Sequence, residues 1–151
     1  MVQKLAHEMK YVNPVKDRST VTLVPYSPEY QEEYKRMYNE SYHEMREALD
    51  IKPYDFIQDD TFFDEGMDKV FLLPDDGRII GSVALKGSEL DDLIVDRRFQ
   101  GQGYGKKILL WALEHMQGDQ IVLHVAAWNE RAIRLYQQNG FEITDTFSFG
   151  A

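Results

Sequence analysis

The sequence contains no cysteine among its 151 residues. A chain without thiols cannot form a disulfide, use a cysteine nucleophile or bind a metal through thiolates, and no other cluster of metal ligands stands out. No apolar run approaches the ~18 residues that a membrane-spanning helix needs, and the first residues lack the apolar stretch of a signal peptide. We therefore expect a cytoplasmic protein with no membrane partner.

Positive charge is scarce, because 17 Lys and Arg stand against 26 Asp and Glu and give a net charge of -9. This balance argues against general binding of nucleic acid. The charges are also uneven. Residues 50–76 hold nine acids and two lysines, whereas residues 97–107 hold four basic residues and no acid. The first region suits a cation, unless it is simply a solvated surface, and the second suits an anion.

The pattern of apolar residues predicts one α/β domain over residues 20–151, with a mixed sheet and helices on its faces. Residues 1–19 are polar and irregular, so we expect an N-terminal arm or extension there. The expected strands cover residues 20–26, 69–87 (a hairpin around Asp76-Gly77), 89–96, 120–127 and 141–149. The expected helices cover residues 27–49, 129–138 and a stretch from the glycines to about 117, with a weaker one at 55–67.

Three glycines, Gly101, Gly103 and Gly105, alternate between an expected strand and an expected helix. A helix N-terminus presents unpaired N–H groups and a partial positive charge, and glycine lets the backbone approach an anion closely. This predicts a phosphate or pyrophosphate site, with a flexible turn and solvated charges as the alternative. The P-loop spacing does not fit, and G-x-G-x-x-G fails because Lys106 takes the third glycine position, so a dinucleotide-binding protein is a weak alternative.

Two blocks of the sequence carry a family resemblance. Residues 100–105, QGQGYG, resemble the Q/R-x-x-G-x-G/A acetyl-CoA motif of the GNAT N-acetyltransferase family, and Val95 precedes them at the family's spacing. Residues 129–132, NERA, and 135–141, LYQQNGF, resemble its N-x-x-A-x-x-L-Y-x-x-x-G-F motif. The resemblance covers residues 20–149. It implies the acyl-CoA N-acyltransferase fold, whose mostly antiparallel sheet splays apart at the cofactor site.

The resemblance also implies the reaction, which is direct transfer of the acetyl group of acetyl-CoA to a primary amine. The pyrophosphate would lie on the glycine turn and the pantetheine arm between the strands at 89–96 and 120–127, where the Val95 N–H would polarise the thioester carbonyl. Asn129 is expected both to cap its helix and to contact the cofactor. The implied cofactor-binding residues are Leu93, Ile94, Val95, Gln100, Gly101, Gln102, Gly103, Tyr104, Gly105, Lys106, Asn129, Ala132 and Tyr136.

Tyr136 matches the family's general acid, which protonates the departing thiolate. A phenol of pKa about 10 is close in acidity to a thiol of pKa about 8.5. Core packing is the other interpretation of Tyr136, and the two are compatible. Three candidates for the general base stay open, Glu89, Asp91 and His124, and each could instead be an ordinary strand residue. A carboxylate in this role needs a raised pKa or a relay through water, because the amine has a pKa of about 10.4.

The acceptor is expected to be a small basic amine: a polyamine, an aminoglycoside-like compound or a lysine-type side chain. Aromatic rings and carboxylates suit a cationic amine, unless the aromatic residues only form core. These aromatic residues are Tyr30, Tyr34, Tyr38, Tyr42, Tyr54, Phe56, Phe62 and Phe63. An acetyl-CoA-binding regulatory module without catalysis is the other hypothesis that stays open.

The sequence departs from the family at both ends. Members usually end with a pair of strands, but only residues 141–149 remain here, so the last strand is expected to be short, absent or supplied by a partner chain. Residues 1–19 are additional and could be the arm of a homodimer.

Overall fold

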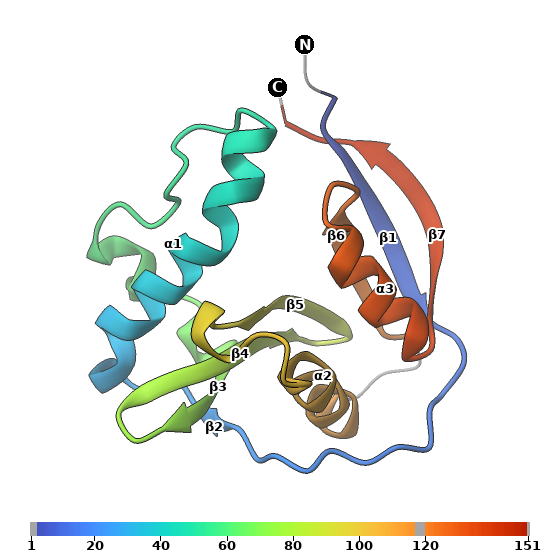
Figure 1. Cartoon of the computed structure of the whole chain (residues 1–151), viewed down its shortest axis with the longest axis horizontal. Coiled ribbons are helices and arrows are strands. Elements are labelled where there is room, and N and C mark those ends of the chain that lie inside the picture. Colours follow the sequence, from blue (N-terminus) through green and yellow to red (C-terminus); the bar gives the residue numbers. More distant parts are fainter. Residues whose placement is uncertain (1–2, 117–119, 151) are drawn as a thin grey trace.

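The computed structural model describes residues 3–116 and 120–150. A seven-stranded sheet runs through the molecule in the order β2-β3-β4-β5-β6-β1-β7 (Figure 1). The strands are β1 (Leu5–Tyr11), β2 (Val24–Pro25), β3 (Val70–Asp75), β4 (Arg78–Lys86), β5 (Glu89–Val95), β6 (Val122–Ala126) and β7 (Phe141–Ser148). The α-helices are α1 (Gln31–Ala48), α2 (Tyr104–His115) and α3 (Glu130–Gln138). The pair β5–β6 is parallel and the other neighbours are antiparallel, so the expected mixed sheet is confirmed.

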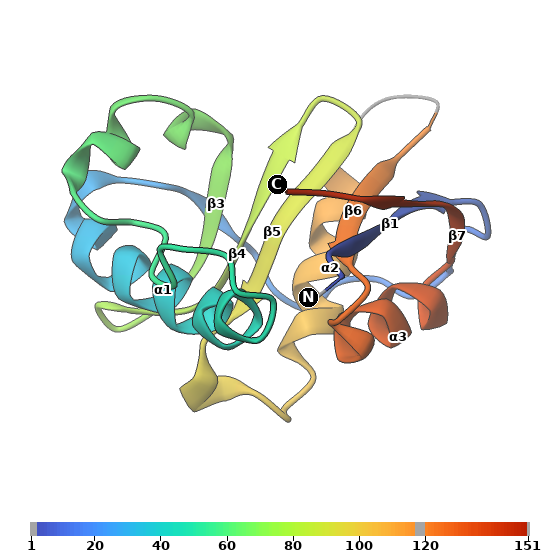
Figure 2. The same ribbon diagram turned by 90° about the horizontal axis from the view of Figure 1, so that it is seen from above.

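The helices cover both faces of the sheet and make two cores. Neighbouring residues of β4 show the division, because Ile79 packs with the α1 residues Tyr34 and Met37, whereas Ile80 packs with the α2 residues Ile108 and Leu109. Successive strand residues point to opposite faces, so α1 and α2 lie on opposite sides of β4. Helix α3 lies beside β6, β1 and β7, at the end of the molecule away from α1 (Figure 2). No helix among the described residues is long and apolar enough to cross a membrane.

The beginning of the chain is a strand inside the sheet. Strand β1 lies between β6 and β7 and pairs antiparallel with both, with Ala6 opposite Ala126 on one side and Phe147 on the other. The prediction of an arm over residues 1–19 is therefore wrong for residues 5–11, and residues 1–2 lie outside the described part. Alternation did not reveal this strand because its buried residues, Ala6 and Met9, are three positions apart. Residues three positions apart on a regular strand point to opposite faces, so β1 is buried at one residue on each face.

Strand β1 also fills the sheet position that the sequence left open beside the last strand. Residues Leu5 to Tyr11 pair along β7, from Leu5 opposite Ser148 to Tyr11 opposite Phe141. The place expected to be empty or supplied by a partner chain is thus taken by the chain's own first strand. The interpretation of this segment as a dimer arm is wrong for the same reason, and the folded domain begins at β1 rather than at residue 20.

Two other expected elements differ from the structure. The strand expected at residues 20–26 is reduced to β2, Val24–Pro25, because the chain that follows β1 first runs along α2 and pairs with β3 only at these two residues. Ser19 anchors that connection, its hydroxyl donating to the Lys107 carbonyl at 2.8 Å and its N–H to the Glu114 carboxylate at 2.7 Å. The helix expected at 55–67 is instead two 3₁₀ turns at 60–64 and 67–69.

The ends of the helices agree more closely with the sequence. Ser27 precedes the 3₁₀ turn Pro28–Tyr30, which leads into α1, but its hydroxyl donates to the Glu29 carboxylate and does not cap the backbone. Asn129 does cap α3, because its side-chain oxygen accepts the Ala132 N–H at 3.2 Å. Helix α2 ends at His115, and the end expected at Gly118 lies outside the described residues.

Met9→Ala is expected to lower the free energy of unfolding by about 2–5 kcal/mol, because the Met9 side chain is fully buried and its removal leaves a cavity. Val12→Ala is the control, since Val12 is 46% exposed just beyond the strand, and should change stability by less than about 0.5 kcal/mol. Urea unfolding of both variants provides the comparison. Equal, near-zero effects would mean that β1 is not part of the core in solution.

Candidate active site

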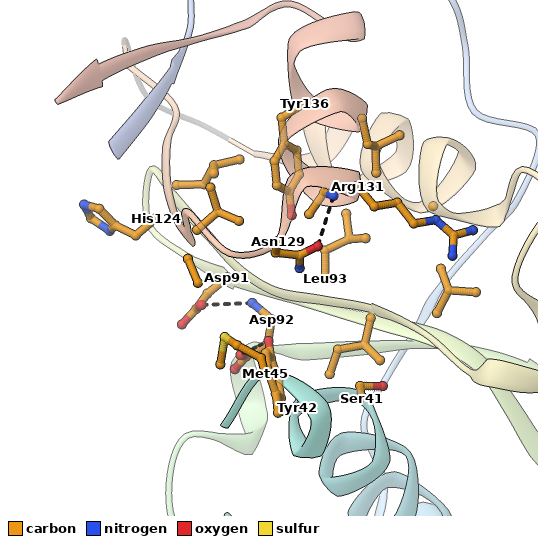
Figure 3. Close-up of a pocket in the computed structure, with 18 of the residues that line it drawn as sticks. Ser41, Tyr42, Met45, Asp91, Asp92, Leu93, His124, Asn129, Arg131 and Tyr136 are labelled. Carbon is orange, nitrogen blue, oxygen red and sulfur yellow. Dashed lines mark hydrogen bonds between the residues drawn. The ribbon is translucent and has the colours of Figure 1, made fainter. Parts of the chain in front are cut away.

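A cavity of about 670 Å³ opens where β5 and β6 separate. The two strands pair only at Glu89 with Val122 and at Leu90 with Leu123, and they diverge beyond these residues. The splayed sheet implied by the resemblance is therefore present. The walls of the cavity come from α1, β5, the glycine turn, β6, α3 and β7, and several of their side chains point into it from opposite sides (Figure 3).

The glycine turn forms one end of this cavity. Gly101 (φ 79°) and Gly103 (φ 85°) adopt left-handed backbone conformations that favour glycine. Gly103 is the N-cap of α2 and its carbonyl accepts the first helical bond, from the Lys107 N–H at 3.3 Å. The preceding N–H groups of the first turn therefore have no partner within the helix. Residues of the turn that line the cavity are Gln100, Gly101, Gly103, Tyr104, Gly105 and Lys106, whereas Gln102 does not.

Side chains around the turn add positive charge and fix its shape. Gln100 donates from Nε2 to the Val95 carbonyl at 3.1 Å and accepts from Arg131 Nη1 at 3.4 Å. Lys106 pairs with Asp17 at 2.6 Å, and both Lys106 and Arg131 line the cavity. Free N–H groups and two cations form the donor set that a pyrophosphate requires, so the residues present fit the implied cofactor.

The backbone of β5 faces the gap between the strands. The Asp96 N–H donates to the Ile80 carbonyl of β4 at 2.8 Å. Since successive N–H groups of a strand point to opposite edges, the Val95 N–H points towards β6 and into the gap. Leu93, Ile94, Val95, Asn129 and Ala132 all line the cavity.

The Tyr136 side chain reaches the cavity from α3. Its ring packs edge-on against Phe141 with centroids 5.8 Å apart, and its hydroxyl points towards β5 (Figure 3). Tyr136 is 6% exposed and lines the cavity, so it packs in the core and also reaches the site, while its role as general acid stays a prediction. Burial, together with the charges of Asp91 and Asp92, raises the pKa of Tyr136 well above its usual value. The phenol is therefore protonated at neutral pH.

Strand β5 is irregular where the sequence predicted a regular strand. Ser82 of β4 lies opposite Ile94 of β5, and Ala84 lies opposite Asp91. One residue of β4 therefore separates the two pairs but two residues of β5 do, so β5 carries a β-bulge. Asp92 lies in this bulge with a φ of 47°. The bulge reverses the faces of the strand, because Leu90 packs in the core under α2 and Ile94 in the core under α1.

Asp92 is a site residue that the sequence prediction missed. Its Oδ1 accepts a hydrogen bond from the Tyr42 hydroxyl at 2.8 Å, and it lines the cavity (Figure 3). Burial and the neighbouring Asp91 raise the pKa of Asp92 to about 6, against the opposing effects of the Tyr42 hydrogen bond and the Lys86 charge. The sequence did contain a signal for this residue. Neighbouring strand residues point to opposite faces, so of two adjacent acids in an apolar strand, one points to each face of the sheet.

The three predicted base candidates lie in different surroundings. Asp91 lines the cavity but pairs with Lys86 at 2.9 Å. His124 also lines the cavity, with Nδ1 3.5 Å from Glu89 and Nε2 3.7 Å from Glu8. Glu89 is not among the residues that line the cavity. His124 is thus held between two carboxylates, one of them from β1.

Aromatic side chains form the walls at the other end of the cavity from the glycine turn. Of the predicted aromatic residues, Tyr38, Tyr42 and Phe56 line the cavity, whereas Tyr34 is buried in the core. Phe56, with exposed Trp128 and Phe147 from the other wall, forms an apolar rim. Arg46 lies over the Phe56 ring, 5.0 Å from its centroid, and brings one positive charge to this wall.

A buried ion pair fixes α1 to the segment between β5 and the glycine turn. Asp96 is 1% exposed and accepts from Arg36 at 2.5 Å and from Arg98 at 3.0 Å, while Glu33 contacts both arginines. Burial alone would raise the pKa of Asp96, but the hydrogen bonds from Arg98 and Arg36 outweigh it and lower the pKa to about 2. The wall that carries Tyr42 is thereby fixed relative to the glycine turn.

Comparison with known proteins now identifies the family. The sequence model of the Acetyltransferase (GNAT) family matches residues 29–141, and the chain belongs to this family of acetyltransferases. Solved structures share the fold: a GNAT acetyltransferase from Colwellia psychrerythraea (TM-score 0.75, 13% identity, 98% of this chain and 57% of that one) and one from Novosphingobium aromaticivorans (TM-score 0.67, 18% identity, 96% and 62%). The dinucleotide-binding alternative is therefore wrong, as the mostly antiparallel sheet also indicates.

One curated relative carries a substrate in its name. Over 64 residues the chain is 38% identical to the spermine/spermidine N(1)-acetyltransferase of Bacillus subtilis (strain 168). The match covers 40% of this chain and 42% of that protein, so it spans less than half of the relative's length.

Asp96→Asn is expected to lower the free energy of unfolding by about 2–4 kcal/mol at pH 7, because it leaves two arginines beside a neutral buried group. The folded pKa lies below the ordinary value of 3.8, so the stabilisation is complete above that value and disappears as the pH falls towards about 2. Asp75→Asn is the control, since its ion pair with Arg78 is exposed and should contribute under about 1 kcal/mol. Denaturant unfolding at pH 7, 4 and 3 tests both variants. A difference between Asp96→Asn and the unmodified chain that does not shrink at low pH would contradict the assignment.

Proposed function

We propose that the protein transfers the acetyl group of acetyl-CoA to a primary amine of a small basic acceptor, with polyamines as the acceptor class. One observation supports this proposal: a single cavity is lined by the glycine turn at the start of α2 and, further from that turn along β5 and α1, by carboxylates and aromatic rings. The Tyr136 hydroxyl points into the same cavity.

The cofactor would be held by the glycine turn and the gap beside β5. The first-turn N–H groups of α2, with Lys106 and Arg131, would bind its pyrophosphate, and the Val95 N–H would donate to its carbonyl oxygen. Bound acetyl-CoA supplies the acetyl group as a thioester, an electrophilic carbon with a sulfur leaving group. The chain's own residues would orient this thioester, remove a proton from the acceptor ammonium and donate a proton to the leaving sulfur.

Asp92 is the group best suited to remove a proton from the acceptor ammonium. With a pKa of about 6, its proton transfer from an amine of pKa about 10.4 costs about 6 kcal/mol, against about 9 kcal/mol for an ordinary aspartate. Of the earlier candidates, Asp91 is engaged by Lys86, and Glu89 lies outside the cavity lining beside His124. We therefore favour Asp92 over Glu89, Asp91 and His124.

Tyr136 would protonate the leaving sulfur. Its raised pKa keeps the proton on the hydroxyl but also makes the phenol a weaker acid than an isolated tyrosine. Protonation of Asp92 counteracts this, because it removes one of the negative charges that raise the pKa of Tyr136. Proton uptake from the amine and proton release by the phenol are thus coupled through one electrostatic interaction.

The acceptor end of the cavity favours a cationic, partly apolar molecule. Asp91 and Asp92 attract ammonium groups, and the aromatic rim suits both methylene chains and cations. The name of the Bacillus subtilis relative supports polyamines as this class. The positive charge of Arg46 repels a cationic acceptor at one wall of the cavity. This favours acceptors whose positive charges lie far apart along the molecule.

The proposal is tested by free-thiol release from acetyl-CoA with spermidine, spermine, aminoglycosides, neutral amines and amino acids. Polyamines should react fastest, and their KM should rise with salt because the carboxylates are screened. Faster acetylation of neutral amines at low salt would overturn the acceptor class. If no amine reacts while acetyl-CoA raises the melting temperature, the chain is a non-catalytic acetyl-CoA-binding module.

Tyr136→Phe is expected to lower kcat about 10²–10⁴-fold with little change in acetyl-CoA affinity, because it removes only the donated proton. Tyr26→Phe serves as the control and should leave kcat unchanged, since it removes a hydroxyl outside the cavity. Steady-state kinetics and calorimetric binding provide the two readouts. An unchanged kcat in Tyr136→Phe would remove this residue from the mechanism.

A further inference from the structure

The Asp92 carboxylate is held by a residue from outside its own strand. The Tyr42 hydroxyl donates to Oδ1 at 2.8 Å from α1, across the cavity wall (Figure 3). The Tyr42 ring packs against the Tyr38 ring, with centroids 4.8 Å apart, and this packing holds the ring that carries the hydroxyl in place. The bulge turns Asp92 towards this helix, while its neighbour Asp91 pairs with Lys86.

Helix α1 makes a second contact just beyond the end of β5. Arg36, six residues before Tyr42, binds Asp96, which is four residues after Asp92. Two carboxylates that flank Val95 are thus each bound by a side chain of one helix. Two such contacts fix the helix against the strand, and they determine where the Tyr42 hydroxyl lies before any ligand binds.

The groups that face Asp92 have opposing effects on its charge. Asp91, on the same strand, disfavours the ionised form, whereas Lys86 from β4 favours it. Tyr34 and Tyr38 from α1 and Tyr136 from α3 lie close enough for the Asp92 charge to affect them, and all three are neutral phenols at neutral pH. The Tyr42 hydrogen bond is therefore the contribution from α1 that favours the carboxylate.

We propose that Tyr42 is a positioning residue for acetyl transfer, whose hydrogen bond directs the Asp92 carboxylate into the cavity and keeps it ionised to receive the acceptor's proton. This inference rests on the proposed function. In the step itself an ammonium N–H bond breaks, an O–H bond forms on Asp92, and the electron pair remains on the amine nitrogen. Tyr42 keeps its own proton throughout.

Tyr42→Phe tests the proposal because it removes the hydroxyl and keeps the ring. A hydrogen bond to the ionised form lowers the pKa, so its loss raises the pKa, and the acidic limb of kcat/KM should move up by about 1–2 pH units. The variant should lose about fivefold or more in kcat/KM at pH 6, recover to within about threefold at pH 9, and bind acetyl-CoA normally. A loss that is equal at every pH would overturn the positioning role.

Two further variants serve as controls for this result. Tyr34→Phe removes a hydroxyl from the core side of the same helix and should leave the acidic limb in place, which separates positioning from general loosening of α1. Asp92→Asn should abolish the acidic limb and lower activity at every pH. An acidic limb that survives in Asp92→Asn would show that another group takes the proton, and the role of Tyr42 would fall with it.

A readout without turnover separates this inference from the proposed function. Carbon-13 NMR titration of the aspartate carboxyls in the full chain should show the pKa of Asp92 raised in Tyr42→Phe and unchanged in Tyr34→Phe. If neither variant moves it, the proposed role of Tyr42 is wrong whatever the protein catalyses. If it moves as expected but no amine is acetylated, the proposed function fails, while the control of Asp92 by Tyr42 is supported.

Discussion

The molecule depends on the separation of β5 from β6 after two paired residues. That separation exposes strand backbone in the middle of a sheet, where unpaired N–H and C=O groups are normally costly. The structure tolerates it because the elements on either side are fixed independently: β5 to β4 and α1, and β6 to β1. The gap can therefore stay open to ligand without the sheet closing on itself.

The charges around this gap are arranged along its length. Lys106 and Arg131 lie at the glycine turn, and Asp91 and Asp92 lie further along β5. An excess of acid over the whole chain is therefore compatible with an anion site, because the local arrangement of charges, and not their sum, determines the field inside a cavity. The same field connects the two proposed proton-transfer residues, since the charge on Asp92 affects the pKa of Tyr136.

The parts that the sequence revealed are those set by local backbone chemistry. A glycine turn before a helix, an asparagine cap and a helix face carrying Tyr136 each depend on residues a few positions apart, so their spacing is visible in the sequence. The place of Asp92 in the site was not predicted, because a single inserted residue in β5 reverses the face of every residue beyond it. Strand β1 and the Arg36–Asp96 pair were not predicted because each depends on a partner far along the chain, and the periodicity of apolar residues gives no information about distant partners.

The position of β1 has a consequence for how the chain is made. Its two neighbours in the sheet, β6 and β7, lie more than 100 residues later, so β1 cannot pair in the sheet until β6 has been synthesised. Sheets built from such distant pairings fold slowly, because the entropy of closing the loop is lost before the contacts form. Until then the Met9 side chain, which is fully buried in the folded chain, lacks Leu123, its partner on β6, and remains exposed apolar surface.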